Sequence, residues 1–320
     1  MKKGFSLLEL IFVIVVLGLV SSMAVNVIMT IYGSYLDTKS IDTISKKSEF
    51  ALEQIKARLE KRVRTPGATI VRDSSGTPYP LSDAPSDEYR IIEWLGIDMD
   101  TYYGEYDIAT NRNLPGWTGF VDIDNINTNK NQIITPGSRL DFANDILLSK
   151  YQGEISLEND SDYSKHPVII FKTLPKNTKA VEGFGWDGTT TTKRVHRVHC
   201  KNYNCVANPD ILTFTNPLSL GTEIYERYDF VTTAYALVFD KDKKYVYLYY
   251  NYRPWNNEKY TDGERALLIS GVNDFIISTK STQTDINDNL SHLLRVVLTV
   301  EDNATSDGDS YKMKKEILVD

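Results

Sequence analysis

The chain has 320 residues and a formal net charge of −7. A negative balance argues against a broad nucleic-acid-binding surface, because such a surface attracts phosphates with clustered cations. The chain is long enough for one large domain with a hydrophobic core of its own, and it contains only two cysteines, Cys200 and Cys205.

The first thirty residues combine a basic start with a long apolar run. Two lysines come first, and from Phe5 to Met29 the only ionisable residue is Glu9. About 20 apolar residues span a bilayer core, so the sequence predicts a transmembrane helix over residues 5–30, with the N-terminus in the cytoplasm. A secretory signal peptide cleaved near residues 21–24 is the alternative. The early carboxylate argues against it, because an intramembrane carboxylate is costly and usually functional.

The helical pattern continues over residues 31–64. No proline interrupts this stretch, and its apolar residues recur at helical spacing on one face, at Ile41, Ile44, Ala51, Ile55, Leu59 and Val63. Pro66 and Gly67 follow and indicate the end of the helix. We expect one long helix whose amphipathic second half is covered by a sheet. The apolar stripe lacks a strict seven-residue repeat, which disfavours a coiled coil.

Residues 65–220 are rich in glycine, proline and small polar residues, which predicts a loop-rich region. A polar segment, residues 175–209, contains both cysteines and reads as a loop. The short elements expected in this region are strands at 89–94, 119–123, 167–172 and 211–215 and a helix at 139–151, with Phe142, Ile146 and Leu147 on one side.

Residues 221–320 contain runs of aromatic and β-branched residues separated by turn residues, a pattern typical of strands. A long helix followed by such a region predicts an α+β fold with an antiparallel β-sheet head and large loop insertions. The expected strands are 223–230, 234–239, 244–252, 265–269, 273–278, 293–300 and 311–319.

A basic leader, a glycine, an aromatic residue and a glutamate follow one another at fixed spacing in Lys3-Gly4-Phe5-Ser6-Leu7-Leu8-Glu9. This motif resembles the N-terminus of type IV pilins and type II secretion pseudopilins. The resemblance implies that a prepilin peptidase cleaves after Gly4, removes a leader of residues 1–4 and methylates Phe5. It also implies that Glu9 is the carboxylate that packs between subunits in a filament.

Three later segments resemble, more loosely, the large J-type minor pseudopilins and related minor pilins: Ala51–Val63, Leu267–Ser278 and Leu294–Val300. The resemblance implies a minor pseudopilin that primes or caps a periplasmic pseudopilus of a type II secretion-like system. A minor pilin of a type IV pilus for DNA uptake or adhesion is the alternative. The implied location is the inner membrane, with a single pass, a cytoplasmic N-terminus and a periplasmic head that is extracted into a filament. The implied partners are membrane lipid, an inner-membrane assembly platform and other minor and major pilins or pseudopilins.

No Ser/His/Asp or Cys/His arrangement in the sequence suggests a catalytic nucleophile, so we expect neither an enzyme nor a cofactor. A head in an oxidising compartment predicts a disulfide between Cys200 and Cys205. A zinc site that adds His196 and His199 is the alternative, although the spacings match no usual zinc finger.

The cysteine region is also basic, with Lys193, Arg194, Arg197 and Lys201 close together. We expect these cations to lie on a solvated loop, and contact with DNA phosphates is the alternative. Two acidic segments, 122–125 and 302–309, are expected to be turns rather than calcium loops. A row of alternating tyrosines, Tyr245, Tyr247 and Tyr249, is expected to pack across strands or to present a partner surface.

Overall fold

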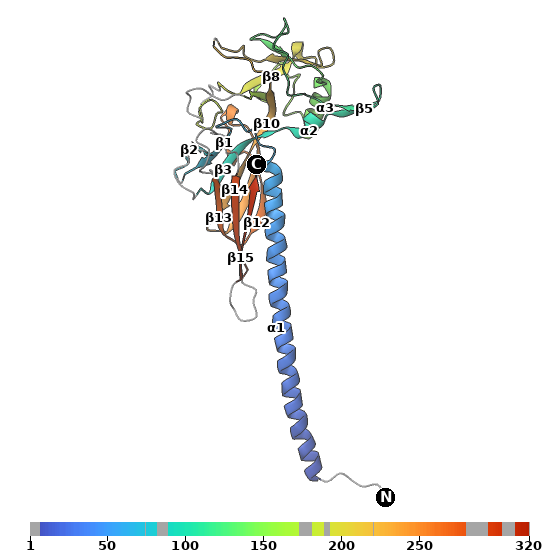
Figure 1. The fold of residues 1–320 in the computed structure, drawn as a ribbon, viewed down its shortest axis with the longest axis vertical. Helices are drawn as coiled ribbons and strands as arrows, with labels where there is room; N and C mark the ends of the chain where they lie inside the picture. Colours follow the sequence, from blue (N-terminus) through green and yellow to red (C-terminus); the bar gives the residue numbers. More distant parts are fainter. Residues whose placement is uncertain are drawn as a thin grey trace, which may run out of the picture.

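The computed structural model describes residues 7–73, 75–81, 89–172, 181–188, 193–219, 221–279, 294–302 and 311–319. Its first element is one uninterrupted helix, α1 (Leu7–Leu59), whose N-terminal half extends away from the rest of the protein (Figure 1). The helix ends before the expected residue 64. There the guanidinium of Arg62 donates a hydrogen bond of 2.8 Å to the carbonyl of Leu59. This bond satisfies one of the carbonyls that a helix leaves unpaired at its C-terminus.

The C-terminal half of α1 carries the expected apolar stripe. Ile44, Ala51, Ile55 and Leu59 are buried, and the helix packs there on β14 (Leu294–Asp302) and β15 (Tyr311–Val319). These two strands and β13 (Val272–Thr279) form a three-stranded antiparallel sheet in the order β13-β14-β15. The stripe is therefore covered by a sheet, as predicted, and helix and sheet share one hydrophobic core.

A second, ten-stranded sheet is built around the thirteen-residue strand β10 (Tyr228–Asp240). One half of β10 pairs with β3 (Ile91–Ile97) and β11 (Tyr245–Tyr252), and the other half pairs with β7 (Val168–Phe171). Strands from both sides of residue 220 thus belong to one antiparallel sheet. The remaining strands of this sheet are β1 (Thr69–Arg72), β2 (Pro78–Pro80), β6 (Gln132–Ile134), β8 (His196–Cys200), β9 (Ile211–Phe214) and β12 (Glu264–Ser270).

A distal lobe lies at the end of the head farthest from the start of α1 (Figure 1). We define it as α2 (Met99–Tyr103), α3 (Leu140–Lys150), the hairpin β4 (Glu105–Asp107) and β5 (Arg112–Leu114), the strands β6, β8 and β9, and η3 (Lys201–Tyr203). Its core is separate from the core beneath α1 and includes Trp117, Leu140 and Leu147. The other short helices of the described chain are η2 (Tyr163–Lys165), η4 (Pro254–Asn256) and η5 (Tyr260–Asp262).

The α+β prediction is confirmed, and several local expectations are corrected. Segments 223–230 and 234–239 do not form two strands, because Val231, Thr232 and Thr233 between them are β-branched and continue β10. The expected strand at 119–123 contributes only an isolated bridge between Phe120 and Arg227. The expected loop at 175–209 contains the short, partly buried strand β8. The polar and basic residues of this segment gave no strand signal in the sequence.

The predicted helix at 139–151 is confirmed, but its buried face differs from the expected one. Leu140, Ala143 and Leu147 are buried, whereas Phe142 is only half-buried. The guanidinium carbon of Arg139 lies 3.9 Å from the centre of the Phe142 ring. A cation–π contact at the surface therefore replaces core burial for this aromatic residue.

Candidate functional site

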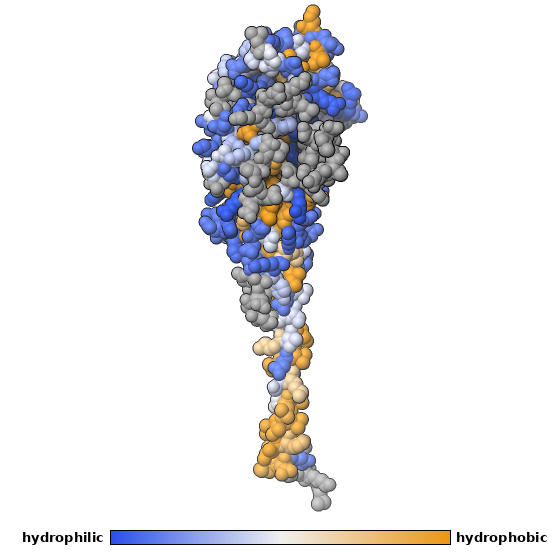
Figure 2. Space-filling model, turned by 60° about the vertical axis from the view of Figure 1, so that its left-hand side comes forward, coloured by the Kyte–Doolittle hydropathy of each residue, from blue (hydrophilic) through white to orange (hydrophobic). Residues whose placement is uncertain are grey.

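The N-terminal half of α1 is an apolar stem, which we define as residues 7–35. Every large apolar side chain in the stem is exposed, the most covered being Val16 at 42%. Figure 2 shows the stem as a mostly hydrophobic column below a mostly hydrophilic head. The stem contains a stretch long and apolar enough to cross a membrane. An exposed apolar surface of this extent needs lipid or other apolar helices around it.

Glu9 lies in the first turn of α1, and its side chain is exposed among the apolar residues of the stem. A carboxylate favours the positive end of the helix dipole, so its place in the first turn is compatible with a stable helix. The expected cleavage residues, Gly4 and Phe5, lie outside the described residues.

Cys200 and Cys205 form the predicted disulfide, at the end of β8 in the distal lobe. Both residues are fully buried, and the amide of Cys205 donates a hydrogen bond of 2.7 Å to the carboxylate of Glu158. The alternative zinc site is wrong, because both sulfur atoms are bonded to each other and cannot act as thiolate ligands. Across the described ranges, no group of histidine, cysteine and acidic residues could hold a metal ion.

His166 and His199 both make contacts with other residues of the protein. His166 is buried, and its two ring nitrogens contact the hydroxyl of Thr215 at 2.7 Å and the carbonyl of Asn159 at 2.6 Å. The ring of His199 stacks on Tyr203, with 4.3 Å between ring centres. Burial lowers the pKa of both histidines, which favours neutral rings at neutral pH.

The expectation of a solvated basic loop is wrong for two of its four cations. Arg197 lies on β8 and donates hydrogen bonds of 2.7 Å to the carbonyl of Trp255 and to the amide oxygen of Asn256. Arg194 donates to the carbonyl of Pro66 at 3.1 Å. Lys193 is exposed and Lys201 is half-buried. The arginines hold segments of the head together, because a guanidinium presents several donors to backbone carbonyls at once.

The tyrosine row lies on β11 as a half-buried ladder. The ring centres of Tyr245 and Tyr247 are 5.9 Å apart, and those of Tyr247 and Tyr249 are 6.5 Å apart. Tyr249 also meets Tyr260 edge to face at 5.1 Å. The rings of the row therefore contact one another along β11 and meet η5 at Tyr260, rather than pairing, within the described residues, with rings on a neighbouring strand. In the acidic segment 122–125, Asp122 accepts a hydrogen bond from Asn125, and most of segment 302–309 lies outside the described residues.

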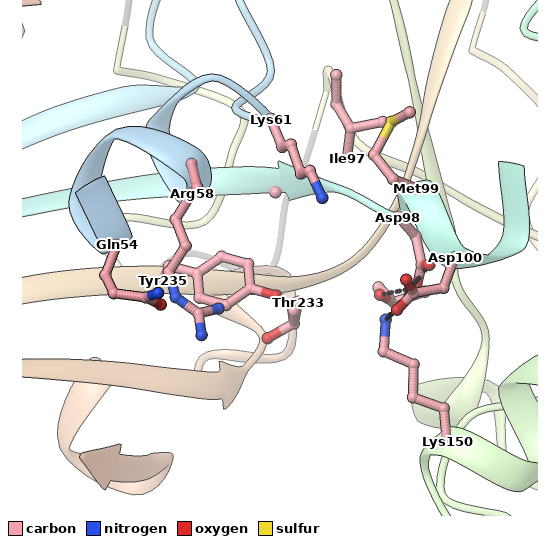
Figure 3. Close-up of a pocket in the computed structure, with 13 residues that line it drawn as sticks. Gln54, Arg58, Lys61, Ile97, Asp98, Met99, Asp100, Lys150, Thr233 and Tyr235 are labelled. Carbon is pink, nitrogen blue, oxygen red and sulfur yellow. Dashed lines mark hydrogen bonds and ion pairs between the residues drawn. The ribbon is translucent and has the colours of Figure 1, made fainter. Parts of the chain in front are cut away.

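A cleft that the sequence did not indicate lies where α1 ends against the large sheet (Figure 3). It has a volume of about 320 Å³. One wall carries side chains of α1 and of the turn that follows it, and the other wall carries the segment after β3 and the end of α3. The lining includes Gln54, Arg58, Lys61, Gly96, Asp98, Asp100, Lys150, Thr233 and Tyr235.

Asp98 and Lys150 form the polar centre of the second wall. The Asp98 side chain is completely buried, and its carboxylate lies 3.2 Å from the ammonium of Lys150. Lys150 also pairs with the more exposed Asp100 at 2.8 Å. Burial opposes the charge of Lys150, but the Asp98 carboxylate outweighs it, and the pKa of Lys150 is raised. The hydrogen bond from Lys150 lowers the pKa of Asp100.

A family model described as the prokaryotic N-terminal methylation motif matches residues 1–25. No curated protein and no solved structure gave a significant match to the chain. The motif covers the start of the apolar stem and the carboxylate in its first turn, and the fold has the long helix and β-sheet head predicted from the sequence. The match over residues 1–25 indicates the type IV pilin and pseudopilin family.

Proposed function

We propose that this protein is a minor pseudopilin that primes or caps the periplasmic pseudopilus of a type II secretion-like system. The observation that carries the proposal is the exposed apolar stem with one carboxylate in its first turn, joined without a break to a large head. A helix of this kind is suited to the membrane before assembly and to packing against other stems afterwards, because both surroundings cover its apolar surface.

The proposed topology is a single pass through the inner membrane, with the N-terminus in the cytoplasm and the head in the periplasm. The lysines that precede the stem support this orientation. The disulfide between Cys200 and Cys205 supports an oxidising compartment for the head. A prepilin peptidase would remove residues 1–4 and methylate Phe5, and an assembly platform would then extract the subunit into the filament.

The proposed role is structural rather than catalytic. The methylation motif belongs to proteins that act by assembling with other pilins or pseudopilins. In this role Glu9 sets the position of the subunit against its neighbour. The positive amine of a processed N-terminus lies about one helical turn from Glu9, so the amine of a neighbouring stem is a suitable partner.

The alternative is a minor pilin of a surface filament for adhesion or DNA uptake. The distal lobe favours it, because this lobe lies at the end of the head opposite the stem and would face outward at a filament tip (Figure 1). Lys193 and Lys201 are the cations of the basic segment that remain for phosphate contacts, since Arg194 and Arg197 bind backbone carbonyls.

Mass spectrometry of the mature N-terminus tests the family role. We expect a chain that begins at a methylated Phe5, and we expect Gly4→Leu to keep its leader and fail to assemble. Gly18→Leu is the matched control, because open space surrounds Gly18 and processing should continue. A mature chain that begins near Val25 would contradict the proposal. Secretion and transformation assays in a deletion strain then separate the two candidate systems.

A further inference from the structure

Three polar side chains on one face of α1 and the turn after it point into the cleft. Gln54, Arg58 and Lys61 are spaced at i, i+4 and i+7, which places them in a row along the helix. Among the described residues, none of the three forms a side-chain hydrogen bond or ion pair. The other cations near the end of α1 behave differently, since Lys56 pairs with Glu60 and Arg62 binds the carbonyl of Leu59. This wall of the cleft is therefore rich in unused donors.

Tyr235 completes the donor wall. Its ring stacks on Trp94, and the guanidinium carbon of Arg58 lies 5.8 Å from the ring centre. Gly96 makes room for this ring, because a Cβ at that position would lie 2.4 Å from a ring carbon of Tyr235. Figure 3 shows Arg58 and Tyr235 side by side, with Lys61 extending over the same space. Burial raises the pKa of Tyr235, so its hydroxyl stays protonated and able to donate.

On the opposite wall of the cleft, the charged side chains form ion pairs with one another. Lys150 lies between Asp98 and Asp100 and pairs with both. The cleft as a whole has three cations, Arg58, Lys61 and Lys150, against these two carboxylates, so one positive charge remains. A single negative charge on a ligand would balance this positive charge. A doubly charged phosphate would leave the cleft with a net negative charge, close to the two aspartates.

We propose that this cleft binds a carboxylate group, held by Arg58 and Lys61 beside the Tyr235 hydroxyl. A guanidinium and a carboxylate match in planar geometry, and such charge-assisted hydrogen bonds are the strong ones. Favourable contact with the helix dipole alone would explain cations near the end of α1. It would not explain why they converge with a tyrosine on a cavity of about 320 Å³.

The carboxylate has two sources, a free organic acid or an acidic side chain of another protein. A second cavity of about 370 Å³ adjoins the cleft and shares Lys150, Thr232 and Thr233 with it. This continuation gives room for the part of a ligand that extends beyond its carboxylate. The inference does not depend on the filament role, since it rests on the residues of the cleft alone.

Isothermal titration calorimetry on the full-length chain in detergent micelles, at constant ionic strength, tests the proposal. One probe is butyrate, a monocarboxylate, and the other is a glycine-flanked glutamate peptide with both ends blocked, so that its side chain is the only carboxylate. We expect saturable binding of at least one probe and a loss of about tenfold or more in affinity for Arg58→Gln. Lys61→Gln should weaken binding in the same direction. Lys46→Gln, an exposed cation on the same helix, should bind as the unaltered protein does.

Tighter binding of the peptide than of butyrate would assign the site to a protein segment, and equal or weaker binding would assign it to a small acid. The absence of saturable binding for both probes would overturn the proposal. Binding that persists unchanged in Arg58→Gln and Lys61→Gln would also overturn it, provided that circular dichroism shows these variants to be folded. A failure to assemble into filaments with carboxylate binding intact would count against the filament role alone. A failure to bind carboxylates with assembly intact would count against the cleft proposal alone.

Discussion

The buried carboxylate of Asp98 accepts a hydrogen bond of 2.7 Å from the hydroxyl of Thr232, although 134 residues separate the two in the chain. Asp98 follows β3, and Thr232 lies within β10. The same carboxylate accepts a hydrogen bond from the amide of Thr101 at 3.2 Å, which caps the start of α2. One side chain thus joins the large sheet to the distal lobe and lines the second wall of the cleft.

We expect Asp98→Ala to destabilise the protein by about 2–3 kcal/mol, because it removes these hydrogen bonds and leaves the partly buried Lys150 with one partner fewer. Thr232→Val should cost about 1–2 kcal/mol, since it removes one donor from a buried acceptor. Asp100→Asn is the control: its side chain is 66% exposed, so the change should be small. Thermal unfolding of the full chain in detergent measures all three. Equal midpoints for Asp98→Ala and Asp100→Asn would contradict this account.

Glu9→Val tests the proposed contact between stems. A carboxylate near the start of a membrane helix costs on the order of 2–3 kcal/mol on insertion scales, so the valine variant should insert at least as well. Processing should also continue, but recruitment into complexes with partner pilins and filament initiation should fall. Glu53→Val, an exposed glutamate on the same helix beyond the stem, should assemble normally. Co-purification with partner pilins is the measurement, and normal recruitment of Glu9→Val would remove this residue from the mechanism.

Arg197→Glu should destabilise the head by about 2–3 kcal/mol, contrary to the expectation of a solvated loop. The substitution removes two hydrogen bonds and places a carboxylate against the carbonyl of Trp255. Lys193→Glu, at an exposed position of the same segment, should change the free energy of unfolding by about 0.5 kcal/mol or less. A loss of transformation with Lys193→Glu alone would favour DNA contact. Arg197→Glu cannot decide that question if it unfolds the lobe.

Replacing both cysteines by serine should lower the stability of the distal lobe by about 2 kcal/mol, the loop-entropy contribution expected for a bridge this short. Cys200 and Cys205 are both buried, so the two serine hydroxyls add a cost of their own where they find no partner. Thermal unfolding compares the variant with the unaltered protein. Alkylation of the denatured, unreduced protein followed by mass spectrometry should detect no free thiol, and labelling of either cysteine would contradict the disulfide.

The stability of the head should fall as the solution is acidified from pH 7 to 4. His196 is packed between Phe171 and Phe214, and burial lowers its pKa from 6.5 to about 4. Between these values the unfolded chain binds a proton at this ring and the folded chain does not. The stabilisation is therefore complete above pH 6.5 and decreases as the pH falls, by up to about 3 kcal/mol.

His196→Phe should make the decrease less steep, because phenylalanine does not titrate and fits an aromatic environment. It should not remove the decrease entirely, since burial also lowers the pKa of His166 and of His199. Thermal midpoints recorded across this pH range measure the effect. Identical pH profiles for the variant and the unaltered protein would show that His196 does not contribute.

The elements that the sequence predicted well are those whose signals are local. An apolar run without helix breakers was enough to predict a helix, and the stem is exposed in the structure because none of the described residues covers it. The strands after residue 240 were predicted for the same reason, since β-branched and aromatic runs lie between clear turn residues. The disulfide was predicted from the oxidising compartment expected for the head, and the structure contains it between cysteines that are five residues apart.

The sequence by itself therefore determined the long helix, the class of the head and the N-terminal motif that indicates the family. Only the tertiary structure decided how β10 joins strands from both halves of the head, and why Arg197 is held inside it. The same is true of the cleft, where Arg58, Asp98 and Tyr235 come from three distant parts of the chain. Pairing and convergence of this kind depend on which strands meet across long loops. Propensity and periodicity depend only on residues that are close in the sequence, so they do not specify these long-range contacts.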